Sequence, residues 1–190
     1  LSEENAVATI AKGYELAGDG STINIGAGTY DQSSSITIDK SVSFVGAEGA
    51  IINKQTASTF SVSYDAPSTA DITIKGLTFT SADVGSSNPM INVLGPADVR
   101  VTDCTFSDCA GGRYGIVRFQ SDSIGTVDNC VFKDLNGTNN ANNNYISILG
   151  NSVVTVKNSN FISEAETDFI FAVIGEEFGF IGVIIYMILI

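Results

Sequence analysis

The chain has 190 residues, of which 44% are hydrophobic and only 16% are charged, well below the usual quarter. Nine Lys and Arg against 21 Asp and Glu give a formal net charge of −12, which argues against binding to the phosphates of DNA or RNA. The absence of His excludes Ser-His-Asp triads and His-ligated zinc, and the three Cys include no C-x-x-C pair that would indicate a metal motif.

The first 19 residues predict a helix that caps one end of a repeat domain. Ser2 is followed by two acidic residues, a pattern typical of a helix N-terminus. Apolar residues then recur at the helical spacing i, i+3, i+4 and i+7: Val7, Ile10, Ala11 and Tyr14. We therefore expect a helix over residues 3–16. The chain begins with Leu1 rather than Met and shows no signal peptide, so we interpret it as a fragment or a processed product.

Residues 20–163 contain a repeat of short alternating strands. Four stretches align, and each holds an alternating strand, a polar corner residue and a second strand: 72–79, 99–106, 125–132 and 154–161. The phenylalanines that end them stand 27, 26 and 29 residues apart. Further short strands are expected between and before these stretches: 23–25, 36–38, 42–44, 60–62, 91–93, 116–119 and 145–148.

This period fits one coil of a parallel β-helix, with three strands and three corners in each coil. Coils stacked about 4.8 Å apart would align equivalent residues in ladders. Two apolar ladders and one corner ladder follow: Phe79, Phe106, Phe132 and Phe161; Ile74, Val101, Val127 and Val156; Gly76, Asp103, Asn129 and Asn158. The corner ladder holds only residue types that tolerate left-handed backbone. A β-sandwich would not repeat the same side chains in register, so the sequence predicts an all-β, single-stranded parallel β-helix, a solenoid.

Charged residues on the expected outer surface give one candidate site. Arg118 alternates with Val117 and Phe119, so it should point out of the coil, and Asp122 follows closely. We favour ordinary solvated surface charges as the interpretation, because no Asp-Asp pair or Asp-x-Asp run occurs in the chain. The other charges expected on this surface are Asp103, Asp108, Arg113, Asp128 and Asp134.

Cys104 and Cys130 occupy one ladder position on adjacent coils. A Cα separation of about 4.8 Å would lie within disulfide range. Side chains in a ladder point the same way, however, so we favour buried free thiols that pack as small apolar groups. Cys109 has no partner by this argument, and no basic cluster lies close in sequence that could create a reactive thiolate.

Segments 18–30 and 36–46, together with the capping helix, resemble the opening of pectin-lyase-like right-handed β-helices. Low-charge coils such as VTVKNSNF at 154–161 resemble those of adhesin-like surface proteins of archaea and bacteria. This resemblance covers about residues 3–163 and implies a right-handed coil, an extracellular or cell-surface location, and polysaccharide or cell-surface glycans as partners.

The same scaffold carries polysaccharide lyases, esterases, hydrolases and inert surface stalks, so the resemblance is specific for fold rather than activity. We expect a non-enzymatic surface segment that needs no cofactor. The alternative is that the chain is a fragment of a carbohydrate-active enzyme with its site near Arg118 and Asp122. In that case Ca²⁺ held by carboxylates would be the cofactor.

The last segment, 164–190, has a different composition. Residues 169–190 carry only two charges, Glu176 and Glu177, and the apolar run after them is shorter than the roughly 20 residues of a membrane span. We therefore expect a hydrophobic, membrane-type helix that is cut short, with membrane contact through residues 169–190.

Residues 164–182 resemble a signature of the SEDS family (FtsW/RodA/SpoVE), multi-pass membrane proteins that polymerise peptidoglycan. The resemblance places Asp168 on the Asp proposed to be catalytic in that family, while Glu166 departs from its usual His or Gln. The family needs many membrane helices and this chain holds at most one, so we expect no glycosyltransferase activity here. We interpret the junction near residue 163 as chimeric, with a natural fusion that continues past Ile190 as the alternative.

Overall fold

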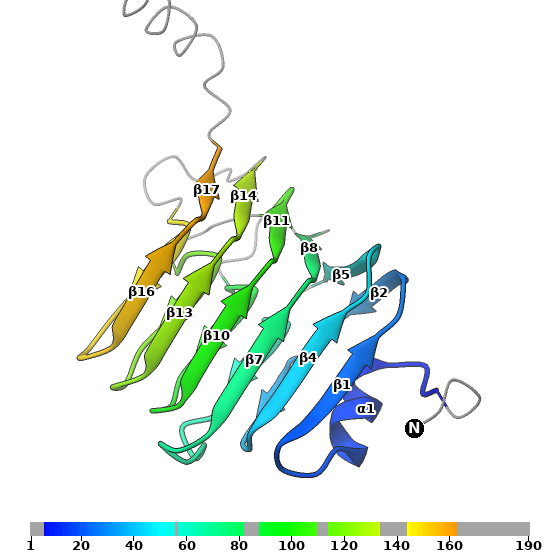
Figure 1. The fold of residues 1–190 in the computed structure, drawn as a ribbon, viewed down its shortest axis with the longest axis horizontal. Coiled ribbons are helices and arrows are strands. Elements are labelled where there is room, and N and C mark those ends of the chain that lie inside the picture. The colour runs from blue at the N-terminus through cyan, green and yellow to red at the C-terminus, as the bar shows by residue number, and fades with distance from the viewer. Residues whose placement is uncertain (1–5, 56, 82–87, 110–113, 134–143, 163–190) are drawn as a thin grey trace, which may run out of the picture.

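The computed structural model describes residues 6–55, 57–81, 88–109, 114–133 and 144–162. Within them one helix, α1 (Ile10–Leu16), is followed by seventeen short strands in three parallel sheets. Each complete coil of the chain contributes one strand to each sheet, so neighbouring strands of a sheet come from successive coils (Figure 1). The predicted parallel β-solenoid is confirmed.

The three sheets have strand orders that step through the chain by three. Sheet 1 contains β1 (Ser21–Ile25), β4 (Val42–Gly46), β7 (Asp71–Lys75), β10 (Asp98–Thr102), β13 (Ile124–Asp128) and β16 (Val153–Lys157). Sheet 2 contains β2 (Gly28–Gln32), β5 (Ala50–Lys54), β8 (Thr78–Ser81), β11 (Thr105–Ser107), β14 (Val131–Lys133) and β17 (Asn160–Phe161). Sheet 3 contains β3 (Ile36–Ile38), β6 (Phe60–Val62), β9 (Ile91–Val93), β12 (Val117–Phe119) and β15 (Ile146–Ile148).

The corner between sheets 1 and 2 depends on left-handed backbone. Its four predicted residues all have positive φ, 67° at Gly76, 55° at Asp103, 51° at Asn129 and 52° at Asn158. Side chains also bond along the ladder, since Asn129 Nδ2 donates to Asp103 Oδ1 at 2.8 Å. Short polar residues that accept this backbone therefore turn every coil at the same place.

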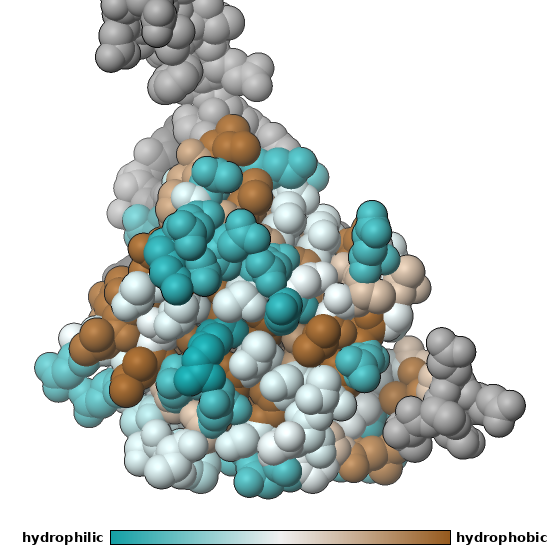
Figure 2. All heavy atoms as spheres, viewed as in Figure 1, coloured by the Kyte–Doolittle hydropathy of each residue, from teal (hydrophilic) through white to brown (hydrophobic). Residues whose placement is uncertain are grey.

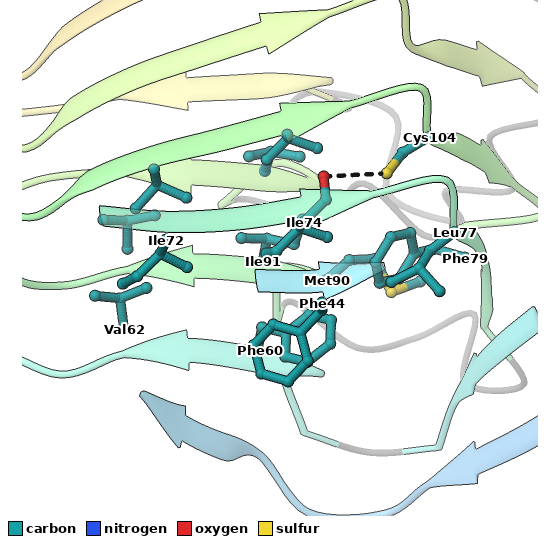
Figure 3. Packing of buried hydrophobic residues seen from close by; sticks show 14 of the residues in the cluster. Phe44, Phe60, Val62, Ile72, Ile74, Leu77, Phe79, Met90, Ile91 and Cys104 are labelled. Carbon is teal, nitrogen blue, oxygen red and sulfur yellow. Dashed lines mark hydrogen bonds between the residues drawn. The ribbon is translucent and has the colours of Figure 1, made fainter. Parts of the chain in front are cut away.

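A stack of phenylalanines fills the interior beside sheet 2. Successive ring centroids of Phe79, Phe106, Phe132 and Phe161 lie 4.9, 4.7 and 5.0 Å apart, with interplanar angles of 8°, 7° and 8°. Nearer the N-terminus, Phe44 of sheet 1 and Phe60 of sheet 3 meet at 4.4 Å and pack below Ile72 and Ile74 (Figure 3). Both predicted apolar ladders are confirmed by the strand register.

The N-terminal helix is shorter than predicted. Helix α1 begins at Ile10, and residues 6–9 are not helical, so the expectation of a helix from residue 3 was wrong for this part. The physical reason is an N-cap at Thr9, whose backbone is extended and whose side chain accepts a hydrogen bond from Lys12 N at 3.2 Å. Ser2, the expected cap, lies outside the described residues.

Helix α1 covers the first coil, as expected of a cap. Ile10 is buried, and the Tyr14 ring stacks on Phe44 at 6.1 Å. The Tyr14 hydroxyl donates to Asp39 Oδ1 at 2.7 Å and accepts from Asp39 N at 2.9 Å. Burial, together with the Asp39 carboxylate, raises the pKa of Tyr14 to about 12.

Two strands of sheet 2, β2 and β5, were missed by the sequence analysis. Each ends on a polar residue that faces the interior, Gln32 in β2 and Lys54 in β5. These residues interrupt the apolar alternation by which the other strands were recognised. The hydrophobic helix expected within residues 164–190 lies outside the described residues.

Removing one ring from the middle of the phenylalanine stack should cost much of the stability. We expect Phe106→Ala to lower the free energy of unfolding by about 3–5 kcal/mol, because it opens a cavity between two buried rings. Phe161→Ala, at the partly exposed end of the same stack, should cost much less. Chemical denaturation of both variants measures the difference, and equal losses would contradict the stacked core.

The corner ladder can be tested at Asn129. We expect Asn129→Ala to be less stable than Asn129→Gly by about 1–2 kcal/mol, because only glycine adopts left-handed backbone without steric cost. Both variants lose the side-chain bond to Asp103, so their difference in denaturant midpoint isolates the backbone conformation. Equal stability would show that the corner relaxes into another conformation.

Candidate functional site

The outer face of sheet 3 carries a row of polar side chains, one from each coil. The register of the parallel strands places these residues side by side: Thr37, Ser61, Asn92, Arg118 and Ser147. Their neighbours along each strand face the core, and Val117 and Phe119 are buried on either side of Arg118. The predicted outward orientation of Arg118 is therefore consistent with its place in the row.

Arg118 and Asn92 hold polar atoms that are buried without a partner. Arg118 lies over the ring of Tyr114, with its guanidinium carbon 4.5 Å from the ring centroid, an arrangement that favours a cation–π contact. Arg118 Nε and, one coil away, Asn92 Oδ1 are both buried and make no hydrogen bond in the described part of the chain. A buried donor and a buried acceptor are thus both unsatisfied on one face, which is an energetically unfavourable state.

Tyr64 and Gln120 border this row where the strands of sheet 3 end. Tyr64 lies in the turn after β6 with 63% of its surface exposed, and its hydroxyl accepts a hydrogen bond from Gln120 Nε2 at 3.1 Å. The two residues are 56 positions apart in sequence and two coils apart in the solenoid. We call Asn92, Arg118, Tyr114, Tyr64 and Gln120 the sheet-3 patch.

Asp122, the second candidate from the sequence, is not part of this arrangement. It is exposed, and with Ser121 it forms a turn after β12 in left-handed backbone, with φ of 61° and 59°. Among the described residues it makes no ion pair with Arg118. The structure therefore does not bring the two candidate residues together, and gives Asp122 a turn position.

Two of the other predicted surface charges, Asp103 and Asp128, lie at the corner between sheets 1 and 2 and pair with lysines of neighbouring coils. Asp103 pairs with Lys75 at 3.5 Å, and Asp128 pairs with Lys157 at 3.3 Å. The side-chain amide of Asn158 and then Lys157 lower the pKa of Asp128 below its usual value. Asp108 also has positive φ, whereas Arg113 and Asp134 lie outside the described residues. Within the described residues no group of three or more Cys, Asp or Glu side chains is placed to hold a metal ion.

The outer faces of the other two sheets differ from sheet 3 because their polar groups satisfy one another. On sheet 1, Arg100 bonds to both Asp71 and Asp98, the latter at 2.7 Å, within a face of mainly polar and small side chains (Figure 2). On sheet 2, Asn53 Nδ2 donates to Asp31 Oδ1 at 2.7 Å. Sheet 3 thus differs in that two of its polar atoms, Arg118 Nε and Asn92 Oδ1, are buried without a hydrogen-bond partner among the described residues.

The three cysteines are buried and free, as the sequence analysis favoured. Cys104 Sγ donates to the carbonyl of Ile74 in the preceding coil at 3.6 Å (Figure 3), and Cys130 Sγ donates in the same way to Val101 at 3.5 Å. Burial raises the pKa of Cys104 well above its ordinary value. These thiols therefore act as small core residues rather than as nucleophiles.

Lys54 is a buried charged residue that sequence reasoning did not single out. Its side chain is fully buried at the inward end of β5, and its Nζ donates to the carbonyl of Asn88 at 3.0 Å. Cys109 lies in the same region, where burial raises its pKa to about 12 although the charge of Lys54 acts in the opposite direction. Aligning the coils would have placed the polar side chain of Lys54 at a core position of the repeat, and this was the signal available in the sequence.

Comparisons with known proteins bear on the end of the chain. A model of the family described as "Cell cycle protein" (FtsW/RodA/SpoVE) matches residues 147–190, less than a quarter of the chain. The match begins inside β15, upstream of the junction expected near residue 163, and supports the resemblance of the tail to the SEDS family. Comparisons with curated proteins and with solved structures give no significant match.

The tail residues that carry this resemblance cannot be placed in the site. Asp168, Glu176 and Glu177 lie outside the described residues, so the role that the resemblance implies for Asp168 stays a prediction. In the part of the chain that the structure describes, no helix is both long enough and apolar enough to cross a membrane.

The state of the thiols can be measured directly. We expect none of the three cysteines to react with Ellman's reagent at pH 8 in the native protein, because all three side chains are buried and the reagent cannot reach them. All three should react after unfolding in guanidinium chloride without reductant. A single reactive thiol after unfolding would instead reveal a disulfide, with Cys104 and Cys130 as the expected pair.

Proposed function

We propose that the β-solenoid is a non-enzymatic, adhesin-like segment of a cell-surface protein, and that it binds a glycan chain along sheet 3. The observation that carries the proposal is the sheet-3 patch, where an exposed tyrosine lies beside buried polar atoms that lack partners. The solenoid would be right-handed, in line with the strong preference of parallel β-crossovers for that hand.

The chemistry of the patch suits a sugar. An exposed tyrosine ring such as that of Tyr64 offers a flat apolar surface on which the C–H face of a pyranose can stack. Arg118 Nε is a donor and Asn92 Oδ1 is an acceptor, which together match a hydroxyl group that both accepts and donates. Because the row repeats from coil to coil, an extended polymer could lie across several coils at once.

A second candidate function is the carbohydrate-active enzyme of the sequence analysis. It would use Arg118 as the base of a lyase reaction on an acidic polysaccharide, with Ca²⁺ held by carboxylates. The same residue therefore serves both candidates, and the two are separated by whether bound polysaccharide is cleaved.

For the tail, we propose that residues 164–190 derive from a SEDS-type membrane protein and have no glycosyltransferase activity in this chain. The support is the family match at 147–190 together with the apolar sequence of residues 169–190. In this proposal the solenoid lies outside the cell, and the tail makes contact with the membrane where lipid is present.

The proposal predicts that substitutions in the sheet-3 patch weaken glycan binding. The full chain is tested for binding to immobilised pectate, pectin, alginate and neutral polysaccharides by biolayer interferometry. On whichever polymer binds, we expect Tyr64→Ala and Arg118→Ala each to raise the Kd by roughly tenfold, since each removes about 1–2 kcal/mol of stacking or hydrogen bonding.

The matched control is Arg100→Ala, which removes an arginine from the middle of an outward-facing strand on sheet 1, where Asp71 and Asp98 already pair with it. It should leave the Kd unchanged. Equal binding by all three variants would place the glycan site elsewhere. Release of unsaturated uronate that needs Ca²⁺ and is lost in Arg118→Ala would establish the enzyme instead.

A further inference from the structure

The last coil of the solenoid exposes residues whose counterparts in the coil before it are buried. Val156 is 42% exposed, whereas its ladder neighbours Val127 and Val101 are fully buried. Phe161 and Ile148 are 43% and 47% exposed, whereas Phe132 and Phe119, one coil before, are fully buried. These side chains occupy core positions of the repeat, so their exposure leaves an apolar end surface that solvent covers poorly.

The backbone at this end is also unpaired. β15, β16 and β17 are the terminal strands of the three sheets, so in the described part of the chain one edge of each has no neighbouring strand. Open strand edges promote pairing with other chains, and repeat proteins usually cover their terminal coils. The opposite end follows this rule, because α1 lies over β1 and the Tyr14 ring packs on Phe44 (Figure 1).

The chain itself supplies a segment suited to the open end. After Phe161 and Ile162 only the short polar stretch 163–168 precedes the 22 residues 169–190, which carry two charges. Val153 and Ile124, which align on the outer face of sheet 1 in the last two coils, are also exposed apolar residues. A segment tethered this closely has an effective concentration near the millimolar range, far above that of a second copy in dilute solution.

We propose that residues 169–190 cover the end surface formed by Ile148, Val156 and Phe161, and so close the C-terminal end of the solenoid in water. In this arrangement the apolar segment and the apolar end surface hide each other from solvent, and the open edges of the last strands are shielded. The occupant is the chain's own tail rather than a second copy or a neighbouring protein.

The experiment measures amide hydrogen exchange of residues 146–162 in the full chain, without lipid or detergent. We expect slow exchange that is independent of protein concentration over a tenfold range, together with a monomer in sedimentation velocity. The double variant Ile184→Asp with Ile188→Asp changes only the tail. It should speed exchange of residues 146–162 by at least tenfold while leaving β7 and β10 unchanged.

A matched pair of valines in β16 tests the end surface itself. Val156 lies on the inward ladder and Val153 aligns with the outward-facing Ile124, so Val156→Asp should speed exchange of the last coil and Val153→Asp should not. Unchanged exchange in the tail double variant would overturn the proposal. Protection that rises with protein concentration, accompanied by a dimer, would assign the surface to a second copy and would also overturn it.

Discussion

The whole structure depends on the spacing of parallel strands, which sets successive coils about 4.8 Å apart and brings equivalent residues into direct contact. Under this constraint each side chain must pack on the equivalent side chains of the coils before and after it. Flat rings satisfy the constraint well, and the stack from Phe79 to Phe161 has nearly parallel planes throughout. The left-handed corner follows from the same constraint, because every coil must turn at the same place for the ladders to stay in register.

The outer faces obey the same geometry but with a different chemistry. On sheets 1 and 2 the stacking brings complementary polar groups together. Arg100 forms ion pairs with Asp71 and Asp98, and the side-chain amide of Asn53 donates a hydrogen bond to Asp31. On sheet 3 the stacking places Asn92 beside Arg118 without such pairing, and the neighbouring coils add Tyr64 and Gln120. The proposed binding surface therefore lies where the polar groups of the ladder do not pair with one another, which is a property of the stacked coils and not of any single coil.

A solenoid has no intrinsic way to end, because its last coil is built like every other one. At the N-terminus the cost of exposing a coil is avoided by α1, whose Ile10 and Tyr14 turn toward the core. At the C-terminus the ladders continue to Val156 and Phe161, where their inward faces are half open. The family match at residues 147–190 includes both the last coil and the residues that follow it.

Much of the fold could be predicted from the sequence because equivalent positions of successive coils carry the same or similar residue types. Four features follow from aligning each residue with its equivalent in the next coil. They are the period of the phenylalanines, the corner ladder from Gly76 to Asn158, the free state of Cys104 and Cys130, and the position of Arg118 on an outer strand face. Each depends on contacts between equivalent positions, and such contacts are visible in an aligned repeat.

Tertiary structure alone decided the features that break the repeat or join different parts of it. Strands β2 and β5 were missed because Gln32 and Lys54 take core positions that propensity assigns to apolar residues. The contact of Tyr64 with Gln120 joins turns two coils apart, and no spacing along the chain predicts it. A stacked chain brings such residues together only after every intervening corner has set its register, which is why the candidate site belongs to the folded solenoid rather than to any motif.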